Sequence, residues 1–170
     1  MRLIILFVCC SLVSTISNAT DTDRIHKFIN FIVDNTELEY NGETVPSIHF
    51  ATHEEMCAVL YTDPPSDCNI AGYYNDDLNQ IWIATSPTKH MVAEGFQDVV
   101  LVHELVHFLQ KVNGVYETIE CRKALERDAF AIQEQFVDEA GLPERQKPDP
   151  LFSLIVSACH PQGLPMWLHQ

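Results

Sequence analysis

Hydrophobic residues near the start of the chain recur with the spacing of an α-helix. Between residues 22 and 34 they stand three and four positions apart, which puts them on one face of a helix. These apolar positions are Ile25, Phe28, Ile29, Ile32 and Val33. Thr22 has the side chain of an N-cap, so the pattern predicts an amphipathic helix that begins there and buries one face.

Shorter elements follow this helix. Residues 45–51 have the composition of a strand, and Thr52 and Glu55 have the spacing of a capping box that opens a short helix. Two β-prone runs, residues 71–74 and 80–84, flank a polar turn and predict a β-hairpin.

Helical patterns dominate the second half of the chain. We expect a helix from about residue 95 to 112, a second from about 117 to 139, and a third that ends near Cys159. Asn113-Gly114 can adopt the left-handed conformation that ends a helix, and it separates the first two. Asp149 has the side chain of an N-cap, and Pro150 suits the first helical position of the third. The pattern predicts an α+β fold, mainly helical, with a small antiparallel sheet before the helix of residues 95–112.

The first residues resemble a secretory signal. Arg2 precedes an apolar run at residues 3–12, and Ser17-Asn18-Ala19 has the small residues of a cleavage site. We therefore expect a signal peptide at residues 1–19 and one domain at residues 20–170, exported and without a stable membrane anchor after cleavage. A short membrane anchor, a buried helix or a lipid on Cys9 or Cys10 are the alternatives.

Four cysteines lie beyond the predicted signal. An even number in an exported chain indicates disulfides, and the spacing favours the pairs Cys57–Cys68 and Cys121–Cys159. A four-cysteine zinc site is the alternative, but no pair is separated by only two residues, as such sites usually require.

The charge of the chain limits its partners. With 10 basic and 24 acidic residues the formal net charge is −14, which disfavours binding to nucleic acid or to anionic lipid. We expect a monomer that acts on a peptide or protein.

The pentapeptide His103-Glu104-Leu105-Val106-His107 gives the strongest indication of chemistry. Four residues apart in a helix, the two imidazoles project from one face and suit two ligands of one tetrahedral zinc ion. Glu104 points aside and is placed to act as the general base on a zinc-activated water. The alternative is a helix with two incidental histidines. Because this helix is apolar on most sides, its polar side chains need buried partners.

A third ligand is expected on the following helix. The turn at Asn113-Gly114 should fold that helix back against the first. Glu126 is the predicted ligand, because catalytic zinc sites commonly use two histidines and one carboxylate. Glu117, Glu120 and Asp128 are the acidic alternatives.

The pentapeptide, followed by Glu126-Arg127-Asp128-Ala129, resembles the gluzincin zinc metallopeptidases in a minimal, zincin-like form. The chain also resembles small exported uncharacterised bacterial proteins. The resemblance implies that residues 80–84 form the sheet edge that pairs with an extended substrate, although an ordinary core hairpin is the alternative. The sequence departs from the gluzincin pattern at Phe130, where an Asp would orient His103, so another group must do so.

A donor for the developing oxyanion is also needed. His160 is the candidate that we prefer, because pairing of Cys121 with Cys159 would tether it near Glu126; Tyr116 is the second. We therefore expect a secreted zinc peptidase in which His103, His107 and Glu126 bind the metal and Glu104 is the general base. The alternatives are a catalytically inactive zinc-binding protein and a disulfide-stapled extracellular interaction module.

Overall fold

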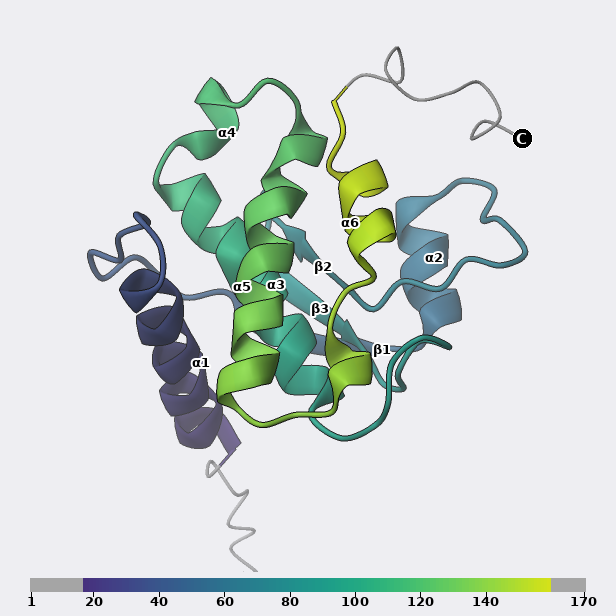
Figure 1. The fold of residues 1–170 in the computed structure, drawn as a ribbon, viewed down its shortest axis with the longest axis horizontal. Helices are drawn as coiled ribbons and strands as arrows, with labels where there is room; N and C mark the ends of the chain where they lie inside the picture. The colour runs from purple at the N-terminus through teal and green to yellow at the C-terminus, as the bar shows by residue number, and fades with distance from the viewer. Residues whose placement is uncertain (1–16, 160–170) are drawn as a thin grey trace, which may run out of the picture.

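The computed structural model describes residues 17–159 (Figure 1). The helices in this range are α1 (Ser17–Asp34), α2 (His53–Leu60), α3 (Phe96–Val112), α4 (Val115–Thr118), α5 (Leu125–Glu139) and α6 (Pro150–Val156), with two short 3-10 helices, η1 (Arg122–Ala124) and η2 (Glu144–Gln146). The strands are β1 (Ser47–Ala51), β2 (Gly72–Asn75) and β3 (Gln80–Ala84). The predicted α+β class is therefore confirmed.

The three strands form a mixed sheet in the order β1-β3-β2. β2 and β3 make the predicted antiparallel hairpin, with Tyr73 opposite Trp82. β1 runs parallel to β3, with Ser47 opposite Gln80. The prediction of an antiparallel sheet was thus wrong for β1. After α2 the chain enters the sheet as β2 in the direction opposite to β1, and the hairpin reverses it again, so that β3 runs parallel to β1.

Helix α3 lies at the centre of the molecule. It packs against β2 and β3 on one side and against α5 on the other, as Figure 1 shows with α5 in front and the sheet behind. The ten residues from Leu101 to Gln110 are all buried. A helix buried on every side must give each polar side chain an internal partner, and these partners define the candidate site.

Helix α1 also packs against α3 and fulfils the predicted amphipathic pattern. The residues of its buried face are Ile25, Phe28, Ile29 and Ile32, with Val33 partly buried beside them. The helix begins at Ser17, however, and not at the predicted cap Thr22. Residues 1–16 of the predicted signal peptide lie outside the described part of the chain.

The turn after α3 is as predicted, but the helix that follows it is not continuous. Gly114 adopts a left-handed φ of 70°. The expected helix of residues 117–139 is instead divided into α4, η1 and α5. Cys121 has extended backbone angles (φ −159°, ψ 160°), and its disulfide to Cys159 anchors the chain at this break. The periodicity of hydrophobic residues alone does not reveal a long-range disulfide of this kind.

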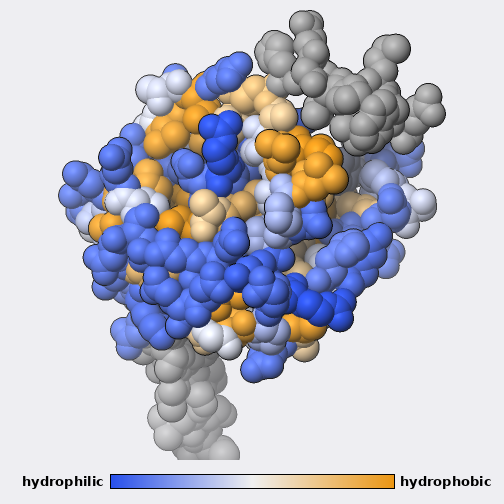
Figure 2. All heavy atoms as spheres, in the orientation of Figure 1, coloured by the Kyte–Doolittle hydropathy of each residue, from blue (hydrophilic) through white to orange (hydrophobic). Residues whose placement is uncertain are grey.

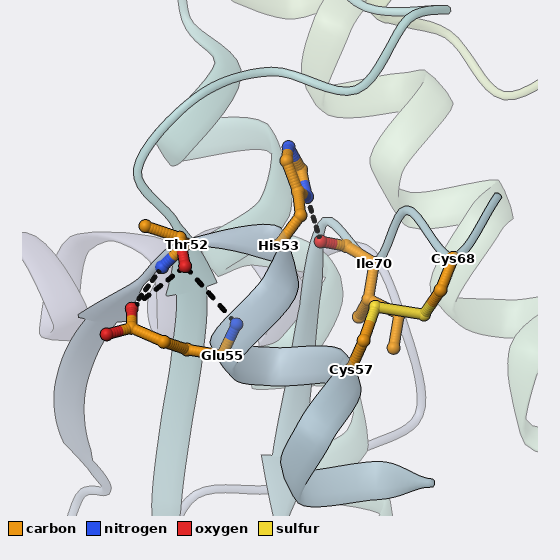
Figure 3. Close-up of a disulfide and its surroundings, with 6 residues drawn as sticks. All are labelled: Thr52, His53, Glu55, Cys57, Cys68 and Ile70. Carbon is orange, nitrogen blue, oxygen red and sulfur yellow. Dashed lines mark hydrogen bonds between the residues drawn. A yellow bond between two sulfur atoms is a disulfide. The ribbon is translucent and has the colours of Figure 1, made fainter. Parts of the chain in front are cut away.

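Two disulfides join the predicted cysteine pairs, Cys57–Cys68 and Cys121–Cys159. Figure 3 shows the first beside the capping box, in which the Thr52 hydroxyl accepts from the Glu55 N–H and the Glu55 carboxylate accepts from the Thr52 N–H. Such disulfides are typical of proteins outside the cytoplasm. Among the helices of residues 17–159, none combines the length and apolar character that crossing a membrane requires.

Candidate metal centre

Helix α3 presents His103 and His107 to one side of the molecule. The two side chains lie one turn apart, and their ring centroids are 5.0 Å from each other. Both residues are buried, and most of the other buried residues of this helix are apolar. The predicted pair of imidazoles is therefore brought together as helix geometry requires.

Helix α5 brings Glu126 to the same point. The Nε2 of His103 lies 3.1 Å from Glu126 Oε2, and the Nε2 of His107 lies 3.5 Å from Glu126 Oε1. Ligands at 2.0–2.1 Å from a tetrahedral zinc ion are about 3.3 Å apart, which is close to both separations. One potential ligand atom from each of the three residues lies within 4.8 Å of the others, so this group has the dimensions to hold a metal ion.

Two buried glutamines fix which nitrogen of each imidazole carries hydrogen. Gln133 Nε2 donates to the carbonyl of Gln146, so its Oε1 is the atom that faces His103 Nδ1 at 3.0 Å. Gln110 Nε2 donates to the carbonyl of Leu125, and its Oε1 faces His107 Nδ1 at 2.9 Å. An amide oxygen only accepts hydrogen bonds, so both Nδ1 atoms are donors and both Nε2 lone pairs face Glu126.

Two imidazole lone pairs and a carboxylate converge in this arrangement, and three acceptors need a cation between them. Burial acts to lower the pKa of His107, but its hydrogen bond to Glu126 and the charge of Glu104 raise that pKa to about 9. Burial acts to raise the pKa of Glu126, but the two histidines hold it far below its usual range. In the metal-free protein a proton therefore supplies the positive charge that a metal ion would supply.

Glu104 lies beside this group at the contact between α3 and β2. It is buried, and burial raises the pKa of its carboxyl group although the imidazoles of His103 and His107 act to lower it. Its carboxylate accepts a hydrogen bond from the backbone N–H of Tyr74. A Cβ at Gly72 would lie 2.4 Å from Val100 Cγ1 and 3.0 Å from Glu104 Oε1. Only glycine allows β2 to approach Glu104 this closely.

A hollow of about 260 Å³, which we call the metal hollow, opens over these residues. Its lining includes Tyr116, whose pKa is raised by burial and by the charge of Asp76 against the opposing effect of Arg122. The Arg122 guanidinium lies 4.3 Å above the Tyr116 ring and 3.1 Å from Asp76 Oδ2. Tyr116, the second predicted oxyanion donor, thus lines the same hollow as the three candidate ligands. His160, the preferred oxyanion donor in the sequence analysis, lies outside the described residues.

The edge strand beside the metal hollow is β2, and the assignment of that edge to residues 80–84 was wrong. β3 is central, because β1 pairs with its other side. Ala84 N–H donates to the Ala71 carbonyl, so alternation along the hairpin turns the polar backbone groups of Gly72 and Tyr74 away from β3. Those groups face the free edge, where the Tyr74 N–H donates to the Glu104 carboxylate.

Sequence reasoning missed the two glutamines that orient the histidines. Gln110 is three residues beyond His107 and shares its helix face, so helical spacing was a usable signal. Gln133 is seven residues beyond Glu126, again on one face of a helix. Phe130, at the position where an Asp was expected, packs on His103 with a 4.8 Å centroid separation. Gln133 takes over the orienting contact one turn further along α5.

Comparison with known proteins places the chain in a family. The family model described as a domain of unknown function, DUF6647, matches residues 18–163, a range that includes all three candidate ligands and Glu104. No curated protein and no solved structure shows significant similarity to the chain. The matched range is most of the 170 residues, and the chain therefore belongs to the DUF6647 family.

Proposed function

We propose that this protein is an exported zinc-dependent peptidase. The observation that supports this most strongly is the convergence of His103 Nε2, His107 Nε2 and the Glu126 carboxylate, with both histidine tautomers fixed by buried glutamines. Two imidazoles and one carboxylate are the ligand set of many catalytic zinc sites. When bound there, zinc would acidify a water molecule and polarise a carbonyl oxygen.

Glu104 is the proposed proton carrier. Its carboxylate lies beside the three candidate ligands, but the side chain leaves α3 in another direction than His103 and His107 and is not itself a ligand. It can therefore accept a proton from the attacking water and give it to the leaving amine. The raised pKa of Glu104 favours this role, because a carboxyl with a pKa nearer neutrality both accepts and releases a proton efficiently.

Tyr116 is the proposed donor to the oxyanion. Its raised pKa means that the phenol keeps its hydrogen over the physiological range, and it lines the metal hollow together with Glu104 and the candidate ligands. Arg122, stacked on its ring, adds positive charge to the same side. The free edge of β2 is the proposed binding strand for an extended peptide.

Export is proposed from the signal-like residues 1–19 and agrees with the two disulfides. An inactive zinc-binding protein would use the same ligands, but it would be expected to close the fourth position with a protein group. The accessible metal hollow favours the peptidase.

The test compares the zinc-loaded wild type with Glu104→Gln and His103→Ala, using metal analysis and hydrolysis of a casein digest. We expect one zinc per chain in the wild type and in Glu104→Gln, and much less in His103→Ala. Hydrolysis should be lost in both variants. Full activity in zinc-loaded Glu104→Gln would disprove the assigned role of Glu104, and a metal-free wild type after zinc dialysis would disprove the metal site.

A further inference from the structure

A second hollow adjoins the metal hollow, and we call it the side hollow. Its volume is about 470 Å³, and Arg122 and Glu126 line both hollows. Its other surfaces are largely apolar and come from Tyr61, Ile70, Phe130, Phe152 and Val156. The side hollow therefore borders the metal site and has room for a large apolar side chain.

The apolar character extends to the surface around the side hollow. Phe152 is 55% exposed and Tyr61 is 46% exposed, although both are large hydrophobic residues. Figure 2 shows one group of hydrophobic side chains over α6 and another towards α4. Exposed apolar surface next to a metal site is typical of a surface that binds a ligand.

The charges of the side hollow are opposite to those of the protein as a whole. The chain has 24 acidic and 10 basic residues, yet both Arg122 and Lys123 line the side hollow. Among the described lining residues the single carboxylate is Glu126, which is already engaged by the two histidines. Lys123 is exposed and forms no ion pair with the described residues, so its charge is available to a ligand.

Two disulfides hold the sides of this hollow in place. Cys121 directly precedes Arg122 and Lys123, and its bond to Cys159 joins η1 to the end of α6. Cys57–Cys68 likewise joins α2, which ends next to Tyr61, to the loop that leads to Ile70. Two disulfides restrict the motion of these segments in the absence of a ligand. This favours binding, because less conformational entropy is lost when the ligand binds.

A third hollow continues beyond Phe130 and Phe152, but its charges do not indicate a preference. Lys89 and Lys147 line it together with Asp67 and Asp149, and Lys147 is already paired with Asp138 at 2.7 Å. Arg122 is likewise paired, with Asp76 at 3.1 Å. Selection by charge is therefore assigned mainly to Lys123, which lies nearer the metal site and has no ion pair with the described residues.

We propose that the side hollow is a substrate subsite that selects a large apolar side chain next to a carboxylate. The preferred substrates are then peptides in which a bulky apolar residue adjoins an acidic side chain or a free C-terminus. Lys123 binds the carboxylate, Arg122 adds to the local positive potential, and the apolar residues bind the side chain. This inference rests on the proposed peptidase function.

The first experiment measures kcat/KM for matched peptide pairs with the zinc-loaded protein. In the first set the N-terminus is acetylated and the C-terminus amidated, and phenylalanine stands before or after either glutamate or glutamine, which gives one matched pair for each order. A further pair ends in phenylalanine with a free or an amidated C-terminus. Since an exposed charge pair contributes modestly, we expect the charged member to be preferred about 3- to 10-fold in at least one pair, which identifies the source of the carboxylate.

Lys123→Gln should abolish this preference, so that the charged and uncharged members of each pair have equal kcat/KM. Lys27→Gln, on the exposed face of α1, is the matched control and should retain the preference. Equal preference in Lys123→Gln and wild type, or no preference in either pair, would overturn the proposal.

Binding to zinc-loaded Glu104→Gln separates this proposal from the proposed function. Fluorescence anisotropy with the same labelled peptides needs no turnover. Charge-selective binding that depends on Lys123 without any hydrolysis by the wild type would support the subsite and disprove the peptidase. Hydrolysis without charge selection would support the peptidase and disprove the subsite. The absence of both binding and hydrolysis would disprove both the subsite and the peptidase.

Discussion

Gln133 accepts the Nδ1 hydrogen of His103 at 3.0 Å across the interface between α5 and α3. The contact is buried, and the Gln133 amide is itself held by the carbonyl of Gln146. Gln133 thereby fixes the His103 tautomer whose Nε2 lone pair faces Glu126, and it does so from the helix that also provides Glu126. One helix thus supplies both a candidate ligand and the group that orients another ligand.

Replacement of Gln133 by Leu should weaken zinc binding about 10- to 100-fold, because the imidazole loses the acceptor that orients it. Competition with a zinc chelator measures the change. Gln110→Leu should have a similar effect through His107, whereas Glu134→Gln, exposed on α5, should have none. Unchanged zinc affinity in both glutamine variants would show that the tautomers do not depend on these contacts.

Tyr116→Phe should reduce kcat about 100-fold and leave the zinc content unchanged, as expected for loss of one donor to an oxyanion. The phenylalanine ring keeps the stacking with Arg122, so the fold of the site should persist. Tyr40→Phe, whose hydroxyl donates to the Glu43 carbonyl, serves as the control for loss of a tyrosine hydroxyl. Full activity of Tyr116→Phe would assign the donor to another group.

Gly72→Ala should lower stability by about 1–3 kcal/mol, as overpacking commonly does, because the new Cβ would lie 2.4 Å from Val100 Cγ1. It should lower activity as well, since β2 is displaced from Glu104. Urea denaturation and kcat/KM measure the two effects. The double variant with Val100→Ala should recover part of the stability, and failure of this rescue would argue against the predicted clash.

Zinc affinity should rise with pH. Burial lowers the pKa of His107, but the Glu126 hydrogen bond and the Glu104 charge raise it to about 9, above its ordinary 6.5. Below pH 9 a bound zinc ion must displace the His107 proton, so the apparent affinity should increase about tenfold per pH unit toward pH 9 and then level off.

The same shift fixes the sign of a stability effect in the metal-free protein. The folded pKa of His107 is raised, so its contribution to stability is complete below pH 6.5 and is lost as the pH rises through about 9. Chelator competition and urea denaturation of the metal-free protein across this range measure both trends. Zinc affinity that does not change between pH 7 and 9 would contradict the assignment.

Replacing both cysteines of a disulfide by serine should destabilise the protein more for Cys121–Cys159 than for Cys57–Cys68. The bridged residues are 38 and 11 positions apart, and loop-closure entropy then gives losses of about 4 and about 3 kcal/mol. Because the Cys121–Cys159 disulfide also anchors η1 and α6 around the side hollow, its loss should raise KM more than it lowers kcat. A larger effect on kcat would place the disulfide's main role at the metal centre.

The sequence by itself determined the features that depend on local geometry. Two histidines four residues apart in a helix must share a face, and the capping box, the left-handed Gly114 and the hairpin each follow from a few neighbouring residues. The cysteine pairing was also predictable, because only three connectivities were possible and one gave a short loop. The proximity of Glu126 followed from the returning helix.

Tertiary structure alone decided the features that depend on distant segments. β1 pairs with β3 through hydrogen bonds between residues more than 30 positions apart, and this pairing makes β2 the free edge. The helix predicted after Gly114 is interrupted near Cys121, which a disulfide joins to Cys159, and hydrophobic periodicity does not reveal this long-range link. Gln133 reaches His103 only because α5 packs on α3 in one register, and packing between helices is set by the fit of many side chains together.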